Sequence, residues 1–244
     1  MLNFIWTREP SEAYLNPYEY AAQEQFVREA LKVLDEFKKH MGNYNRKFSR
    51  DDTSLDKAIW MLQMDAIDSL LECHNLLSNK KHKIAGRLFR DTIEVLDLAS
   101  FFNAKSERSK NLLKKWFKDE VIPNREFRNY IKENQGEKKA KQLASFYSQL
   151  SKLNHRTYRS LAYGYILGKN EMLVYDGFQK SDLLVFPGTI SMYYSLLANL
   201  IRLLSTELIN GGLIKIEIIN HIWDKCIEDN PEERKFVIRE PITD

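Results

Sequence analysis

Apolar residues return at three- and four-residue intervals along most of the chain, and this spacing is typical of amphipathic helices. Short polar links and residues that end helices, mainly Gly and Pro, separate the periodic segments. The segments that we predict to be helical are 18–41, a helix capped by Asp52 or Thr53 and running to Asn79, 83–102, 105–120, 123–134, 137–163, 187–209 and 213–228. The fold class that follows is mainly α, a single bundle of long antiparallel helices with a core at 18–228 and a surface or frayed tail at 229–244.

The helix predicted at 83–102 is apolar around more than half of its circumference, as helices in the middle of a bundle are. Its charged side chains form one narrow stripe, made of Arg87, Arg90, Asp91 and Glu94. One turn later the same side is apolar, so we expect the stripe to be covered or to line a cleft. The alternative is an ordinary surface ion pair between Arg90 and Glu94, which would contribute a few tenths of a kcal/mol.

The helical period breaks between the segments 137–163 and 187–209. Two short apolar runs, 165–167 and 172–175, flank a Gly-Lys-Asn turn. This pattern is typical of a small β-hairpin. We therefore predict one short hairpin or irregular insertion near 165–175.

Charge is spread unevenly along the chain, although the net charge of its 244 residues is only +3. The segment 105–160 holds 15 Lys and Arg against 6 Asp and Glu, a net +9, so the rest of the chain carries −6. Basic segments with interleaved aromatic residues are a composition that nucleic-acid surfaces use. The alternative is a solvated helix face whose aromatic residues turn to the core. The aromatic residues of this segment are Trp116, Phe117, Phe127, Tyr130, Phe146, Tyr147 and Tyr158.

The cysteines and the hydropathy of the chain indicate the cellular compartment to expect. Cys73 and Cys226 lie far apart and neither belongs to a CxxC pair, so we expect no disulfide framework and a cytoplasmic protein. The N-terminus has no basic start followed by an apolar run, which argues against a secretory signal. The segment 183–201 carries no charge, but Pro187, Gly188 and several polar residues interrupt it. We expect a buried core helix there and no membrane span.

Several familiar chemistries lack their motifs in this chain. Three residues separate the glycines of GYILGKN, where a phosphate-binding loop needs four, and no GxGxxG, GxSxG, HExxH or ExxH occurs. A zinc site would require the second and last predicted helices to meet. Its residues would be Cys73, His74, His82, His221 and Cys226. We expect no cofactor and no metal site.

One polar constellation remains, contributed by two of the predicted helices. Its members are Arg87, Arg90 and Glu94 from the first helix and Tyr147, Ser151, His155 and Arg159 from the second. A guanidinium can hold a phosphate, and a histidine can act as base or acid near neutral pH. We take Arg90, Glu94 and His155 as candidate catalytic residues and the other four as candidate ligand-binding residues. The alternative for His155 is a hydrogen-bonded packing residue at the border of the helix face.

These two helices also carry a resemblance. The segment RLFRDTIE at 87–94 and the segment YSQLSKLNH at 147–155 are similar to the motifs of an uncharacterised family of bacterial all-helical proteins. That family carries an R-x-x-R-x-x-x-E helix and a later Y-x-x-L-S-x-x-x-H helix. More distantly, the region 55–163 resembles the HEPN helical superfamily, many of whose members are RNases in toxin and phage-defence systems. The HEPN ribonuclease motif places an Arg four to six residues before a His, and none of the five His of this chain has an Arg in that window.

Two functions stay open at this point. The first is a binding module whose polar Arg/Glu/His cleft and basic segment contact RNA or another protein. The second, which the resemblance implies, is a HEPN-like metal-independent RNase of a toxin or phage-defence system that uses Arg90, Glu94 and His155. A homodimer formed through an exposed apolar helix face is a further expectation, and no membrane partner is expected.

Overall fold

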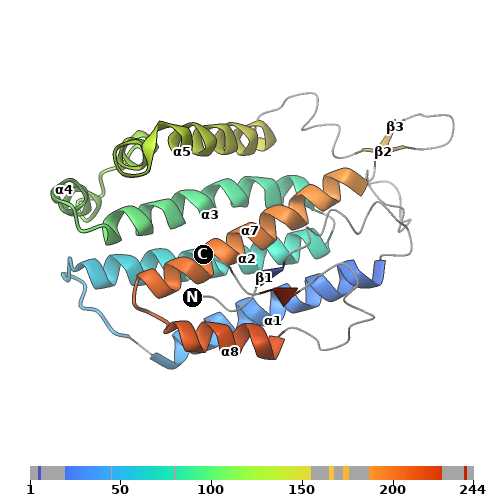
Figure 1. Ribbon diagram of the computed structural model, residues 1–244, viewed down its shortest axis with the longest axis horizontal. Coiled ribbons are helices and arrows are strands. Elements are labelled where there is room, and N and C mark those ends of the chain that lie inside the picture. Colours follow the sequence, from blue (N-terminus) through green and yellow to red (C-terminus); the bar gives the residue numbers. More distant parts are fainter. Residues whose placement is uncertain are drawn as a thin grey trace.

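Helix α3 (His82–Asn103) lies in the middle of the bundle in the computed structural model, as its apolar circumference predicts (Figure 1). The structure describes residues 5–6, 20–44, 46–79, 81–154, 165–167, 173–175, 187–226 and 239–240. Four other helices pack against α3. They are α2 (Leu55–Ser78), α4 (Glu107–Trp116), α5 (Asn124–Asn154) and α7 (Pro187–Asn210).

The mainly helical bundle predicted from the sequence is confirmed. Helix α1 (Tyr20–Tyr44) packs against α2, and α8 (Ile216–Cys226) packs against α1. Figure 1 shows α5 as an outer layer on α3, with α1 and α8 at the opposite side of the bundle. Consequently the segment that holds most of the positive charge covers α3 on one side and faces solvent on the other.

The core forms where the apolar sides of α2, α3 and α7 meet. Phe89 of α3 stacks on Tyr193 of α7, with ring centroids 6.2 Å apart and both side chains buried. The fully buried apolar residues of these helices include Ala58, Ala66, Ile67, Leu70, Ala85, Phe89, Leu96, Leu197, Ala198, Ile201, Leu204 and Leu208. Burial of α7 agrees with the expected core helix in this region. Within the described parts of the chain, no helix has the length and hydropathy that a membrane crossing requires.

Local signals end the helices close to the predicted positions. Ser54, and neither Asp52 nor Thr53, caps α2, because its backbone is extended and its hydroxyl accepts a hydrogen bond from the amide of Lys57 at 3.2 Å. The carboxylate of Asp52 instead accepts a bond from the amide of Ser54 at 2.8 Å. Gly136 has a φ of +86° and separates α5 into the two predicted helical halves. Positive φ angles at Lys105 and Asp119 make α4 shorter than the predicted segment 105–120.

Four short strands form two antiparallel pairs. Strands β2 (Tyr165–Leu167) and β3 (Leu173–Tyr175) pair Ile166 with Val174, which confirms the hairpin predicted near 165–175. Strand β1 (Ile5–Trp6) pairs with β4 (Arg239–Glu240), so segments near the two ends of the chain lie side by side. The remainder of the predicted tail at 229–244 lies outside the described residues.

Candidate functional site

A hydrogen bond between α3 and α5 joins the two sequence motifs. The Nη1 of Arg90 donates to the Oγ of Ser151 at 2.9 Å, and the Nε of Arg90 donates to Glu94 Oε1 at 2.9 Å. The side chains of Arg90 and Glu94 are 35% and 37% exposed. Arg90 therefore links a carboxylate of its own helix to a hydroxyl 61 positions away, at a place that solvent and a ligand can reach.

Tyr147 approaches α3 one turn further along. It is buried, and its hydroxyl donates a hydrogen bond to the carboxylate of Asp97. Burial raises the pKa of Asp97 to about 8, with a further increase from Glu207 and Glu94, while the bond from Tyr147 acts in the opposite direction. Burial and the neighbouring Asp97 likewise raise the pKa of the Tyr147 hydroxyl above its ordinary value. Both groups are therefore largely protonated near neutral pH.

The other predicted site residues lie outside this contact. Arg87 is exposed on α3, three positions before Arg90. His155 and Arg159 lie outside the described residues, and His155 follows the last described residue of α5 directly in the sequence. Of the seven candidate residues, the structure thus brings Arg90, Glu94 and Ser151 together and places Tyr147 one turn away.

A pocket of about 270 Å³ lies between α3 and the start of α5, and Glu94 is one of its lining residues. Charged, amide and apolar side chains share the lining. The residues are Asp91, Glu94, Val95, Asp97, Leu98, Phe101, Ile122, Pro123, Asn124 and Phe127. It lies where the charged stripe of α3 passes into Leu98 and Phe101, which is where the sequence predicts a covered or cleft-lining stripe.

Asp97 is a pocket residue that sequence reasoning missed. The signal was present, because Asp97 follows Glu94 by three positions in an otherwise apolar segment and so lies on the same side of the helix. Asn124, at the first position of α5, gave no such signal. It enters the pocket because the loop between α4 and α5 brings it toward α3.

A second buried carboxyl group lies on the neighbouring helix. Glu207 of α7 is 5% exposed, and burial raises its pKa to about 7, whereas bonds with Asn210 and Ser100 act to lower it. Its backbone carbonyl accepts a hydrogen bond from Gln63 Nε2 of α2 at 2.6 Å. Polar groups therefore connect α2, α7, α3 and α5 through the interior of the bundle.

The basic segment has a clear inner and outer side. Trp116 and Phe117 contact each other, and Trp116 also contacts the buried Phe102. Phe127 and Tyr130 likewise pack with the core. The described aromatic residues of this segment thus turn inward, as in the alternative stated for the sequence, whereas nearly all of its described Lys and Arg side chains are exposed.

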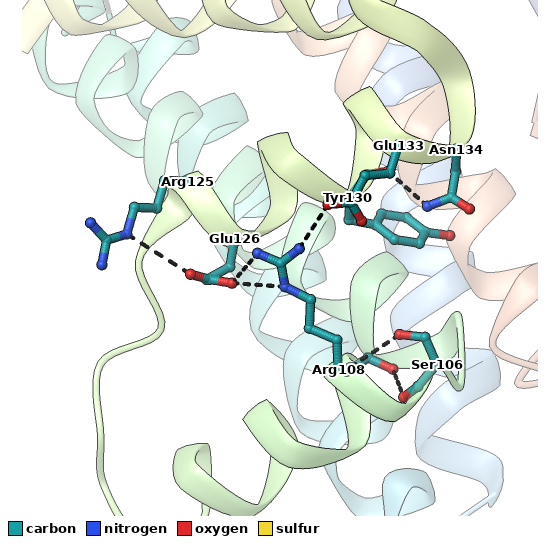
Figure 2. Close-up of polar contacts among 8 residues, drawn as sticks. Ser106, Arg108, Arg125, Glu126, Tyr130, Glu133 and Asn134 are labelled. Carbon is teal, nitrogen blue, oxygen red and sulfur yellow. Dashed lines mark hydrogen bonds and ion pairs between the residues drawn. The ribbon is translucent and has the colours of Figure 1, made fainter.

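Arg108 connects α4 to α5 (Figure 2). Its Nη2 and Nε donate to Glu126 Oε2 at 2.6 and 3.0 Å, and its Nη1 donates to Glu133 Oε1 at 3.2 Å. Helix α4 is capped by Ser106, whose hydroxyl accepts a bond from the amide of Ser109. Most of the acidic charge of this region is therefore paired, which leaves the lysines further along α5 to dominate its outer side.

The cysteines and histidines of the described residues form no metal site. Across those residues, no group of three or more Cys, His, Asp or Glu side chains is placed to hold a metal ion. Cys73 and Cys226 are buried with free thiols. Burial raises the pKa of both thiols, that of Cys226 to about 11, so both thiols stay protonated near neutral pH.

Comparisons with protein-family models, with curated proteins and with solved structures gave no match. A functional assignment therefore depends on the chain's own residues.

Proposed function

We propose that this protein is a helical binding module that holds the phosphate backbone of a nucleic acid on the outer face of α5. The supporting observation is a stripe of exposed lysines on that face, which consists of Lys138, Lys141 and Lys152. At 100° per residue these three side chains fall within one quarter of the helix circumference, opposite the apolar residues that pack on α3. We call this stripe the lysine face.

The neighbours of the lysine face favour an anionic partner. Ser145 and Ser148 lie between the lysines on the same side and are exposed, so they can donate hydrogen bonds to phosphate oxygens. From position 138 to position 154 the sequence holds four Lys and no Asp or Glu. Glu137 directly precedes this stretch, and its Oε1 lies 3.4 Å from the Nζ of Lys141. Binding of a polyanion to such a surface is favourable because it releases the counterions of the polyanion.

Arg90 can extend the contact to the cleft between α3 and α5. An arginine has five N–H donors, and the described bonds of Arg90 to Glu94 and Ser151 use two of them. Its remaining donors and the exposed Arg87 three positions earlier are suited to a phosphate. The inward-facing aromatics leave little for base stacking, so we expect binding with weak sequence preference.

Fluorescence anisotropy with single-stranded RNA, single-stranded DNA and duplex DNA tests this proposal. The test variant carries Lys138→Gln, Lys141→Gln and Lys152→Gln. The control variant carries Lys39→Gln, Lys47→Gln and Lys215→Gln, which removes the same charge from exposed positions on other elements. Each lost phosphate contact reduces the magnitude of the slope of log K against log salt by about 0.9 for duplex DNA. The slope of the test variant should therefore be smaller in magnitude than that of the wild type by up to about three.

The control variant should keep most of the wild-type salt dependence. Equal losses in the two variants would mean that only net charge matters and would contradict a defined face on α5. Absence of binding to all three nucleic acids at about 50 mM salt would also rule the proposal out.

A metal-independent RNase is the second candidate function, and the contact of Arg90 with Ser151 favours it. In such a reaction the RNA 2′-oxygen attacks the adjacent phosphorus and the 5′-oxygen leaves, giving a 2′,3′-cyclic phosphate and a 5′-hydroxyl. A base takes the proton of the 2′-hydroxyl and an acid returns one to the leaving oxygen. We assign both proton transfers to His155, which would accept the proton of the 2′-hydroxyl and pass it to the leaving 5′-oxygen. We assign the charge stabilisation at phosphate to Arg90, which Glu94 orients.

RNA cleavage assays, and growth assays on expression in a bacterial host, test this second function. His155→Ala and Arg90→Ala should each abolish cleavage while leaving binding by the lysine face measurable. The lysine-face variant should weaken substrate binding without abolishing turnover at saturating RNA. If cleavage or toxicity survives both His155→Ala and Arg90→Ala unchanged, the RNase assignment is wrong.

A further inference from the structure

The pocket between α3 and the start of α5 has a polar side that descends into the protein. Asp91, Glu94 and Asp97 are three residues apart and follow one edge of α3. Asp91 is exposed, the Glu94 side chain is 37% exposed, and Asp97 is 7% exposed. The three carboxyl groups therefore lead from the mouth of the pocket to its floor.

The floor of the pocket is held in place by hydrogen bonds. The hydroxyl of Tyr147 donates to Asp97, and Tyr147 is also hydrogen-bonded with the side chain of Asn124. Both Asp97 and Asn124 line the pocket. Groups that are already oriented by the protein bind a ligand at a lower entropic cost than mobile surface side chains do.

The remaining walls are apolar and rigid. Phe101 and Phe127 line the pocket, and both rings contact Tyr130, with centroids 5.3 and 6.3 Å apart. Val95, Leu98 and Ile122 extend this apolar surface. Among the described lining residues there is no Lys, Arg or His, and Arg90, which is bonded to Glu94, is not part of the lining.

We propose that this pocket binds a small aliphatic amine, whose ammonium group is held by Glu94 and Asp97 and whose hydrocarbon chain lies against Phe101 and Phe127. The charged ammonium group of the amine forms hydrogen bonds with the carboxyl groups, and the hydrocarbon chain displaces water from the aromatic wall. A metal ion fits less well, because the apolar walls supply no ligands and the carboxyl groups are not placed to hold one.

The dimensions narrow the class of amine. The volume of about 270 Å³ is near the lower end of small-molecule pockets, which begin at about 300 Å³. The helix rises about 9 Å over the six residues from Asp91 to Asp97. A diamine with a chain of about four to six carbons can therefore place one ammonium group at the floor and the other at the mouth. This site does not depend on the lysine face, whose residues follow Gly136 in α5; the one link between the two proposals is the bond of Arg90 to Glu94.

Protonation of Asp97 gives the site a distinct pH dependence. The charged and titratable groups around this carboxyl are Glu94 on α3, Tyr147 on α5 and Glu207 on α7. Because the pKa of Asp97 is raised to about 8, the carboxyl group loses its proton as the pH rises through that value. An alkylamine stays charged over the same range, with a pKa of about 10.4. Amine affinity should therefore increase between about pH 7 and about pH 9.

Isothermal titration calorimetry of the full chain with 1,4-diaminobutane and n-butylamine tests the proposal. Both are used as hydrochlorides, against a sodium chloride blank of equal ionic strength. n-Butanol and sodium butyrate keep the hydrocarbon body and change the head group. Both amines should bind, and the alcohol and the carboxylate should not.

Two pocket variants and one matched control complete the test. At about pH 9, where Asp97 is deprotonated, Glu94→Gln and Asp97→Asn should each weaken amine binding about tenfold, because each removes a charged hydrogen-bond partner. Asp97→Asn should also abolish the pH dependence. Glu72→Gln removes one negative charge from an exposed position of α2 and should leave the affinity unchanged. Glu94 is partly exposed, so Glu94→Gln keeps the test valid if Asp97→Asn impairs folding, which circular dichroism would reveal.

Three results would overturn the amine site. They are absence of heat and of thermal stabilisation with both amines, equally tight binding of n-butanol, and unchanged amine affinity in both pocket variants. The lysine-face variant should bind amines as the wild type does. Loss of nucleic-acid binding with retained amine binding would therefore separate failure of the proposed function from failure of this site.

Discussion

The hydroxyl of Tyr147 on α5 donates a hydrogen bond to the buried carboxyl group of Asp97 on α3, across 50 positions of sequence. This bond joins the outer helix to the centre of the bundle at the floor of the pocket. It also places an ionisable group where ionisation opposes folding, because burial raises the pKa of Asp97 to about 8. The stability of the protein should depend on pH for this reason.

We predict that the free energy of unfolding decreases as the pH rises from about 5 to about 8. Asp97 and Glu207 have folded-state pKa values of about 8 and about 7, both above their values in an unfolded chain. The folded state therefore binds more protons in this range, and its advantage is lost as the pH rises through those values. Each group changes the stability by at most about 1.4 kcal/mol per pH unit.

Urea unfolding at a series of pH values measures this effect. Asp97→Asn keeps an acceptor for Tyr147 but does not titrate, so its stability should change less with pH than that of the wild type. Glu207→Gln should behave in the same way at slightly lower pH. Glu72→Gln, at an exposed position, should retain the wild-type profile. A wild-type stability that rises between about pH 5 and about pH 8 would contradict the prediction.

The bond from Arg90 to Ser151 should make a small but measurable contribution to the docking of α5. Arg90→Ala and Ser151→Ala, combined in a double-mutant cycle, should give a coupling energy of about 0.5–1 kcal/mol, since the pair is partly exposed. Chemical denaturation of the four proteins measures it. Pairing Arg90→Ala with Ser148→Ala serves as the control, because Ser148 lies on the exposed side of the same helix, and that cycle should show no coupling.

Arg108 should hold α4 against α5. Replacing Arg108 with Ala removes its bonds to Glu126 and Glu133 and should cost about 1 kcal/mol, with faster hydrogen exchange in α4. Arg125→Ala is the control (Figure 2), because that side chain is 72% exposed and its contact with Glu126 is 3.9 Å long. Equal exchange rates in the Arg108 variant and the wild type would show that apolar packing alone fixes α4.

Two glycines should respond in opposite ways to replacement by alanine. A Cβ at Gly211 would lie 2.7 Å from Gln63 Nε2 and 2.9 Å from a methyl group of Ile59, so Gly211→Ala should destabilise the fold by about 1–3 kcal/mol. A Cβ at Gly42, within α1, would meet nothing within 4 Å, and Gly42→Ala should stabilise by up to about 1 kcal/mol. Thermal unfolding of both variants tests the pair. A stabilising Gly211→Ala would mean that α2 and the end of α7 are less closely packed than described.

Most of the fold could be predicted from the sequence. The helical period located every described helix, and Gly136 marked the break inside α5 because its positive φ is accessible to glycine. The prediction for the cap of α2 was wrong by one or two positions. Asp52, Thr53 and Ser54 are all good capping residues, and only the local backbone decides which hydroxyl or carboxylate faces the free amides.

The candidate site was less accessible to sequence reasoning. The helix with Arg90 and Glu94 and the helix with Tyr147 and Ser151 could be identified from their residues, and their contact in space stayed an expectation until the structure described it. Asp97 was overlooked because the sequence does not reveal how deeply a single carboxylate of an apolar helix is buried. From the sequence, the aromatic residues of the basic segment were equally consistent with a nucleic-acid surface and with the core. In the structure, the described ones pack against the core.

The sequence by itself determined the helices, their approximate ends and the small hairpin, because these depend on the spacing of apolar residues and on Gly, Pro and Ser at particular positions. The tertiary structure decided which side chains meet. Arg90 reaches Ser151, Tyr147 reaches Asp97, and a pocket remains between α3 and the start of α5. These features depend on how the apolar faces of helices distant in sequence pack together, and the same packing sets the burial that raises the pKa of Asp97.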